Sequence, residues 1–160
     1  MPNPVLVLGL GNPLAGDDGV GSRIAEALVR NPRLPEGIDV MQAGSDLLRL
    51  APYMDGRTDV VLLDAVLTDG GVGTVSVLTD VCGMDMRQGH AHHLSAVQAM
   101  ALLRSVVPRL DRVRCTWITI GVADSRISHD LSPALDAMLP GIVDTVLTAL
   151  HAIHGTPDAA

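Results

Sequence analysis

Residues 59–66 read DVVLLDAV, an apolar run interrupted near its end by one carboxylate, that of Asp64. Continuous apolar runs of this length are typical of strands that are buried on both faces of a parallel sheet. An unpaired carboxylate is costly to bury, so it normally has a partner, a metal ion or a shifted pKa. The stretch therefore predicts a central strand and marks Asp64 as a candidate functional residue.

The segments on either side of this stretch alternate between strand and helix patterns. Short apolar runs predict further strands, beside the one at 58–66, at residues 5–10, 38–41, 74–78 and 113–122. Helical spacing of apolar residues predicts helices at residues 19–30, 46–53, 92–106 and from 133 onward. Ser132 and Pro133 are typical of a helix N-cap and first turn, and Pro140 should kink the last helix.

Strands that alternate with helices indicate an α/β fold, a three-layer arrangement with a largely parallel sheet flanked by helices. The length of 160 residues predicts a single domain over residues 1–160, with a frayed tail after about residue 155. Ligands of such sheets bind at the carboxyl ends of the strands. Asp18 follows the first strand, Asp64 lies near the end of a later strand, and His92 lies where a loop enters a helix. These three side chains are therefore expected to converge on one edge of the sheet.

Charge and composition exclude several classes of function. The formal net charge is −7 and no run of basic residues occurs, which argues against nucleic-acid binding. No apolar run reaches the roughly 18 residues of a membrane span, and the N-terminus lacks the basic segment of a signal peptide. Cys82 and Cys115 have no metal-type spacing, so reduced thiols in the cytoplasm are expected. Cys115 is assigned to the packing of a strand, whereas Cys82, in a loop, stays open as a nucleophile.

The glycine-rich segment after the first strand, GLGNPL at residues 9–14, looks like a dinucleotide fingerprint but has Leu14 where the third glycine should stand. We therefore interpret it as a tight turn that brings backbone close to a site. Asp17 and Asp18 follow this turn at the start of a helix pattern. Asp17 is expected to cap that helix, which leaves Asp18 free for a site, and Asp69 is assigned to a turn.

Three histidines, His90, His92 and His93, precede the third predicted helix or begin it. Imidazole and carboxylate ligands together suit Ni, Zn, Co or Mn, and three ligands from separate loops leave coordination positions open, as catalytic metals require. Spacing alone does not choose among the three histidines. The other histidines are expected at the surface: His129, His151 and His154.

Three segments resemble the motifs of the hydrogenase maturation endopeptidases. The first is residues 5–21, with the glycine turn and its acidic pair; the second is LLDAV at residues 62–66; the third is HHL at residues 92–94. They occur in the order of that family and at about its spacing, and the likeness runs to the final helix. The resemblance implies a twisted α/β sheet flanked by helices.

The activity implied by this resemblance is removal of a C-terminal extension from the precursor of a [NiFe]-hydrogenase large subunit after nickel insertion. The metal-contacting and catalytic positions of the family fall, residue by residue, on Asp18, Asp64 and His92. The nickel would come with the precursor, although another divalent metal could occupy the isolated protein. It would polarise the scissile carbonyl or activate a water, with one carboxylate as general base. We expect a cytoplasmic monomer whose partner is that precursor.

Two other functions fit part of the sequence. Peptidyl-tRNA hydrolases also begin with a Gly-Leu-Gly-Asn-Pro turn, but they continue with a tyrosine, a Thr-Arg-His-Asn run and a basic face. This chain continues with LAGDD at residues 14–18 and is acidic. A nickel-dependent binding or chaperone module that does not cut would use the same three ligands. Single-turnover cleavage separates that module from a protease, because a binding module leaves the mass of its partner unchanged.

Overall fold

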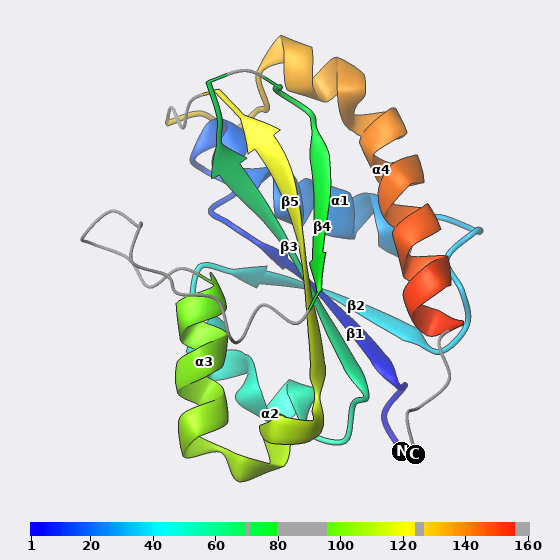
Figure 1. The fold of residues 1–160 in the computed structure, drawn as a ribbon. Helices are drawn as coiled ribbons and strands as arrows, with labels where there is room; N and C mark the ends of the chain where they lie inside the picture. Colours follow the sequence, from blue (N-terminus) through cyan, green and yellow to red (C-terminus); the bar gives the residue numbers. More distant parts are fainter. Residues whose placement is uncertain (70, 80–95, 124–126, 156–160) are drawn as a thin grey trace.

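The computed structural model describes residues 1–69, 71–79, 96–123 and 127–155. In this part of the chain the strands form a sheet in the order β2-β1-β3-β5-β4 (Figure 1). They are β1 (Val5–Leu10), β2 (Ile38–Gly44), β3 (Asp59–Leu67), β4 (Val75–Thr79) and β5 (Arg114–Val122). β1, β2, β3 and β5 are parallel, and β4 pairs antiparallel with β5 at the edge. The prediction of a largely parallel sheet is confirmed.

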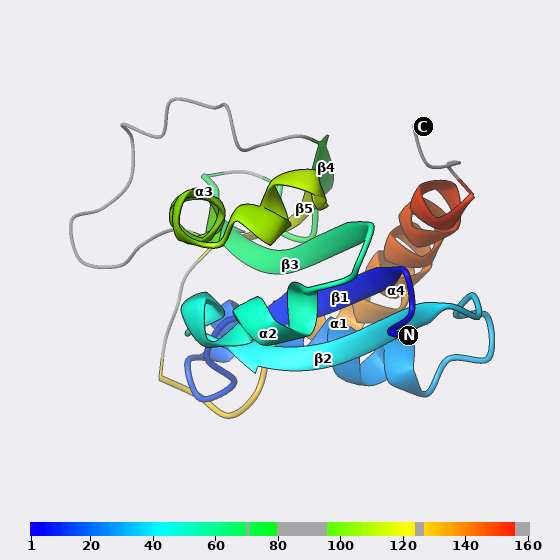
Figure 2. The same cartoon turned by 90° about the horizontal axis from the view of Figure 1, so that it is seen from below.

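Helices cover both faces of the sheet, which confirms the three-layer arrangement (Figures 1 and 2). α1 and α4 lie on one face, and α2 and α3 lie on the other. Their bounds are α1 (Val20–Val29), α2 (Ala51–Met54), α3 (Ala96–Val106) and α4 (Pro133–His154), with 3-10 turns η1 (Gly16–Gly19), η2 (Leu47–Leu50) and η4 (Pro108–Arg112). The helix predicted at residues 46–53 forms as η2 followed directly by α2. The predicted start of α3 near His92 lies outside the described residues.

Each face of the sheet carries its own apolar cluster, because side chains alternate along a strand. In β3, Val61 and Leu63 pack with α1 and α4, whereas Val60 and Leu62 pack with α3. All four side chains are fully buried, as predicted for a strand that is covered on both faces. Asp64 follows Leu62 by two residues, so it lies on the α3 face near the carboxyl end of β3.

The two carboxylates of residues 59–66 have different environments. Asp59, the first residue of β3, accepts two hydrogen bonds from the Arg114 guanidinium, at 2.8 and 2.9 Å, and one from the Thr58 hydroxyl at 2.8 Å. This ion pair joins the first residues of β3 and β5, so Asp59 has a structural role. Asp64 lies at the opposite end of the run, where no basic side chain among the described residues forms an ion pair with it.

α4 is long and apolar enough to span a membrane by length and composition alone, yet one of its faces is buried against the core. Leu135, Val146 and Leu150 are fully buried in the apolar cluster that α4 shares with α1. Ser132 caps the helix as predicted, because its hydroxyl accepts a hydrogen bond from the Leu135 N–H at 3.4 Å. The helix continues through Pro140.

Candidate active site

Asp18 is held in place by the glycine-rich turn that follows β1. Gly11 has a φ of +101°, and a Cβ atom there would lie 1.9 Å from the backbone oxygen of Asp18, so the turn requires glycine. This close approach lets the Asn12 N–H donate a hydrogen bond to Oδ2 of Asp18 at 2.9 Å. Asp18 is partly buried, and its other oxygen has no hydrogen-bond partner among the described residues. One oxygen of this carboxylate is therefore available to a ligand.

A second glycine brings the start of α1 against the strand that carries Asp64. A Cβ atom at Gly21 would lie 2.3 Å from the carbonyl oxygen of Leu63, so any larger side chain would push the helix away from β3. The η1 turn, which contains Asp18, directly precedes α1. The same close packing therefore brings Asp18 toward the carboxyl end of β3.

The expectation that Asp17 caps α1 is wrong. The residue before α1 is Gly19, and no side chain caps this helix. The Asp17 carboxylate is buried, and its Oδ1 accepts a hydrogen bond at 2.6 Å from the Ser132 N–H at the start of α4. Asp17 thus joins the loop after β1 to the loop before α4. Local sequence carries no signal for this contact, because its two residues are 115 positions apart.

Asp64 has an environment that favours proton exchange near neutral pH. Burial, and to a lesser degree the negative charge of Asp18, raises the pKa of Asp64 from its usual value near 3.8 to about 6. The Ala65 N–H, which donates to Oδ1 at 2.9 Å, and the Trp117 indole oppose this rise in pKa. A carboxyl group with such a pKa can hold or release a proton close to neutral pH, as a general acid or base must.

Two of the three predicted site residues are therefore brought together. Asp18 changes the pKa of Asp64 through its charge, so the two carboxylates lie near each other at the predicted edge of the sheet. His90, His92 and His93 lie outside the described residues, so the third ligand stays a prediction. Within the described ranges alone, no group of three His, Cys, Asp or Glu side chains could hold a metal ion. A metal site at the two carboxylates would need a ligand from elsewhere.

Several smaller assignments are confirmed, and two contacts were missed. Cys115 is buried in β5, Asp69 is exposed in a bend, and the surface histidines are exposed as expected: His129, His151 and His154. Cys82 lies outside the described residues.

Sequence reasoning did not single out Asn12, whose contact with Asp18 is made by backbone, or Trp117, whose place beside Asp64 depends on strand register.

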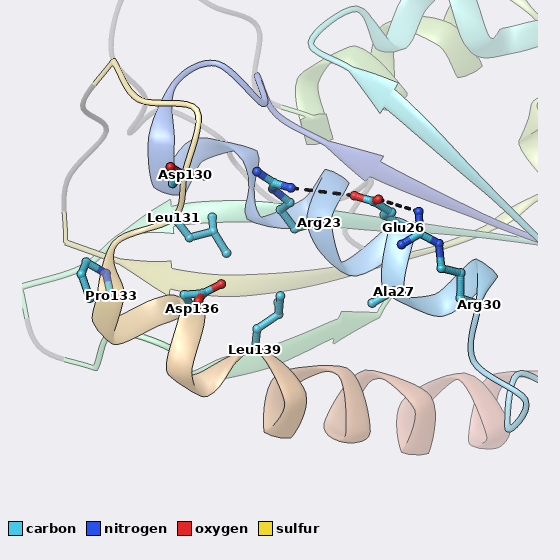
Figure 3. Close-up of a pocket in the computed structure, with 9 residues that line it drawn as sticks. All are labelled: Arg23, Glu26, Ala27, Arg30, Asp130, Leu131, Pro133, Asp136 and Leu139. Carbon is cyan, nitrogen blue, oxygen red and sulfur yellow. Dashed lines mark hydrogen bonds and ion pairs between the residues drawn. The ribbon is translucent and has the colours of Figure 1, made fainter.

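A groove of about 550 Å³ lies away from the two carboxylates, between α1 and α4 (Figure 3). Figure 3 shows Arg23 and Glu26 on α1 and Arg30 directly after it, with two ion pairs that share Glu26. A hollow of about 260 Å³ adjoins this groove and reaches the turn after β1. The groove borders the α1 face of the sheet, whereas Asp64 faces α3. We therefore place the candidate site at the carboxylates and not in the groove.

The family model for hydrogenase maturation proteases matches residues 22–149 of the chain, which include Asp64. The chain belongs to the hydrogenase maturation protease family. A relative in this family, the hydrogenase 2 maturation protease of Escherichia coli (strain K12), is 27% identical over 151 residues, 92% of this chain and 90% of the relative. The segment that the family model matches begins after Asp18. The alignment with the E. coli protease is longer than that segment.

Solved structures of hydrogenase maturation proteases share this fold. The hydrogenase maturating endopeptidase HybD from E. coli superposes with a TM-score of 0.75 at 26% identity, covering 95% of this chain and 93% of its own. The [NiFe] hydrogenase maturation protease HybD from Thermococcus kodakarensis gives a TM-score of 0.73 at 27% identity, covering 94% and 99%. The resemblance read from the three sequence motifs is thus confirmed for the family and the fold.

Proposed function

We propose that this hydrogenase maturation protease removes the C-terminal extension of a [NiFe]-hydrogenase large-subunit precursor after nickel has been inserted. Membership of the family supports the protease activity. The observation that supports this site most is an effect of Asp18 on Asp64 at the carboxyl edge of the sheet. The charge of Asp18 raises the pKa of the partly buried Asp64 carboxylate. Two carboxylates that influence each other in this way suit metal binding and proton transfer.

We assign Asp18, Asp64 and His92 as the residues that contact the nickel of the precursor. Two carboxylates and an imidazole form a donor set that nickel accepts, and each carboxylate has one oxygen held by a backbone N–H. No other donor among residues 1–69, 71–79, 96–123 and 127–155 bonds to these carboxylates, so the second oxygen of each is proposed as the metal ligand. When bound, nickel would act as a Lewis acid toward the scissile carbonyl.

One of the two carboxylates also serves as general base in this proposal. Asp64 is the better suited, because in the metal-free protein its pKa of about 6 makes it a stronger proton acceptor than an ordinary carboxylate before nickel binds. Its bond from the Ala65 N–H fixes the orientation of the carboxylate on β3. Asp18, held by the Asn12 N–H, would bind the metal without moving a proton.

An apolar surface beside the site supports recognition of a protein substrate. Leu14, Leu67 and Ile127 are 54%, 61% and 98% exposed, and each follows or ends a strand at the carboxyl edge of the sheet. The parallel bridge between Ala15 and Ser128 brings the loops of Leu14 and Ile127 together. Exposed apolar side chains on neighbouring loops, as at Leu14 and Ile127, are typical of protein interaction sites. We propose that the precursor docks here, on a cytoplasmic monomer.

Processing of a nickel-loaded precursor by site variants tests these assignments. Asp18→Ala and Asp64→Asn should abolish cleavage, whereas Asp69→Asn, in an exposed bend, is the matched control and should cleave at the wild-type rate. His92→Gln should also abolish cleavage, and His90→Gln and His93→Gln should not. Wild-type rates for Asp18→Ala or Asp64→Asn would show that the site lies elsewhere.

A further inference from the structure

Trp117, on β5, carries a buried polar atom without a partner. Its indole Nε1 is inaccessible to solvent, and no acceptor among the described residues lies within hydrogen-bond geometry of it. Buried N–H groups in native proteins are nearly always paired, because an unpaired one loses its hydration without compensation. An unpaired donor in this position therefore calls for a functional explanation.

The strand register brings this donor to Asp64. β5 lies beside β3 with Trp117 opposite Leu62 and Thr119 opposite Asp64. Side chains two residues apart share a face of the sheet, so Trp117 and Asp64 both lie on the α3 face. The indole packs against the apolar cluster of that face. Its N–H lies toward the Asp64 carboxylate, close enough to favour the charged form but outside hydrogen-bond geometry.

Asp64 has room for a second donor. Its Oδ1 accepts one hydrogen bond, from the Ala65 N–H, whereas an ionised carboxylate can accept about four. Among the described residues this backbone N–H is the one hydrogen-bond donor to Asp64, and one such contact does not fix the plane of a carboxylate. A second donor from the neighbouring strand would fix that plane.

We propose that Trp117 is a positioning residue for Asp64: its indole N–H donates a hydrogen bond to the carboxylate when Asp64 engages the metal-bearing precursor. The inference rests on the proposed role of Asp64. The donor has no partner among the described residues and becomes paired on engagement, so its pairing favours the engaged state. Carboxylates that bind metals are themselves usually oriented by such hydrogen bonds, and their loss costs about 10–100-fold in affinity or activity.

The single tryptophan of the chain makes a selective test possible. Biosynthetic replacement of tryptophan by 3-benzothienylalanine changes residue 117 alone, keeps its shape and exchanges the N–H for sulfur. We expect the single-turnover rate of precursor processing to fall about 10–100-fold while the urea midpoint of unfolding stays the same or rises. The matched control is 5-fluorotryptophan, which keeps the N–H and should process at the wild-type rate.

An unchanged rate with the benzothienyl residue would overturn the proposal, and so would equal losses of rate and stability, which indicate a packing role. A second readout does not depend on cleavage. The single indole resonance in a ¹H–¹⁵N spectrum should move downfield when nickel-loaded precursor is added to wild type, and should stay in place in Asp64→Ala. If precursor is not cut but the resonance moves, the protease assignment fails and the role of Trp117 stands. If the resonance does not move on binding, the role of Trp117 is refuted.

Discussion

Replacing Asp64 by asparagine should make the protein more stable at neutral pH while it removes activity. Folding raises the pKa of Asp64 from about 3.8 to about 6, so the folded state favours the neutral carboxyl group. The contribution of this group to stability is therefore fully present below the unfolded pKa and is lost as the pH rises through the folded pKa. Asparagine is neutral at every pH and keeps an oxygen for the Ala65 N–H.

The size of the effect follows from the two pKa values. Each unit of difference corresponds to about 1.4 kcal/mol, so the ionised carboxylate of Asp64 costs the folded state about 3 kcal/mol above its pKa of about 6. For a chain of this length that free energy corresponds to about 6–12 °C in Tm. We expect Asp64→Asn to exceed wild type by about this amount at about pH 8, and to match it at about pH 3, below both pKa values.

Urea and thermal unfolding of both proteins across this pH range measure the difference. Asp39→Asn is the control of opposite sign, because the hydrogen bond from Arg57 holds the pKa of Asp39 below its usual value. That stabilisation is present above the unfolded pKa and is lost as the pH falls through the folded one, so Asp39→Asn should lose stability near neutral pH. A stability difference for Asp64→Asn that is absent at about pH 8, or that does not change with pH, would refute the electrostatic account.

Three further changes have defined outcomes. Asp17→Ala removes the acceptor of the Ser132 N–H and should cost about 1–3 kcal/mol of unfolding free energy in urea titrations; no loss would mean that the contact is dispensable. Gly11→Ala strains a backbone with φ of +101° by about 1–3 kcal/mol and places a Cβ against the backbone of Asp18. Stability and processing should therefore fall together. Processing at the wild-type rate would show that the site does not depend on this turn. Ile127→Asp should weaken precursor binding by calorimetry and leave the unfolding midpoint unchanged, since Ile127 is 98% exposed; unchanged binding would place the docking surface elsewhere.

Much of the fold could be predicted because its strands are buried on both faces. β1 and β3 consist mainly of apolar residues, and such runs identify central strands without reference to the rest of the chain. β2 was predicted to end at Met41 but extends to Gly44, because pairing with β1 continues across a register shift that local composition does not reveal. The antiparallel direction of β4 likewise depends on the path of the connection and not on its own residues.

The candidate site could be predicted only in part for a similar reason. Asp18 and Asp64 were identifiable because a carboxylate beside an apolar strand is unusual in itself. The surroundings of these residues are set by tertiary structure: the Asn12 N–H reaches Asp18 through a turn that requires glycine, and the pairing of β3 with β5 places Trp117 beside Asp64. Asp17 was misassigned because its acceptor role depends on a residue in a distant loop.

The intact mass of a [NiFe]-hydrogenase large-subunit precursor after incubation with this protein shows whether the protein cuts its partner. We expect the nickel-loaded precursor to lose a C-terminal peptide, and we expect no change in the mass of the nickel-free precursor or of either form with Asp18→Ala. An unchanged mass of a cognate nickel-loaded precursor that binds wild-type protein would contradict the account and indicate a module that binds without cutting.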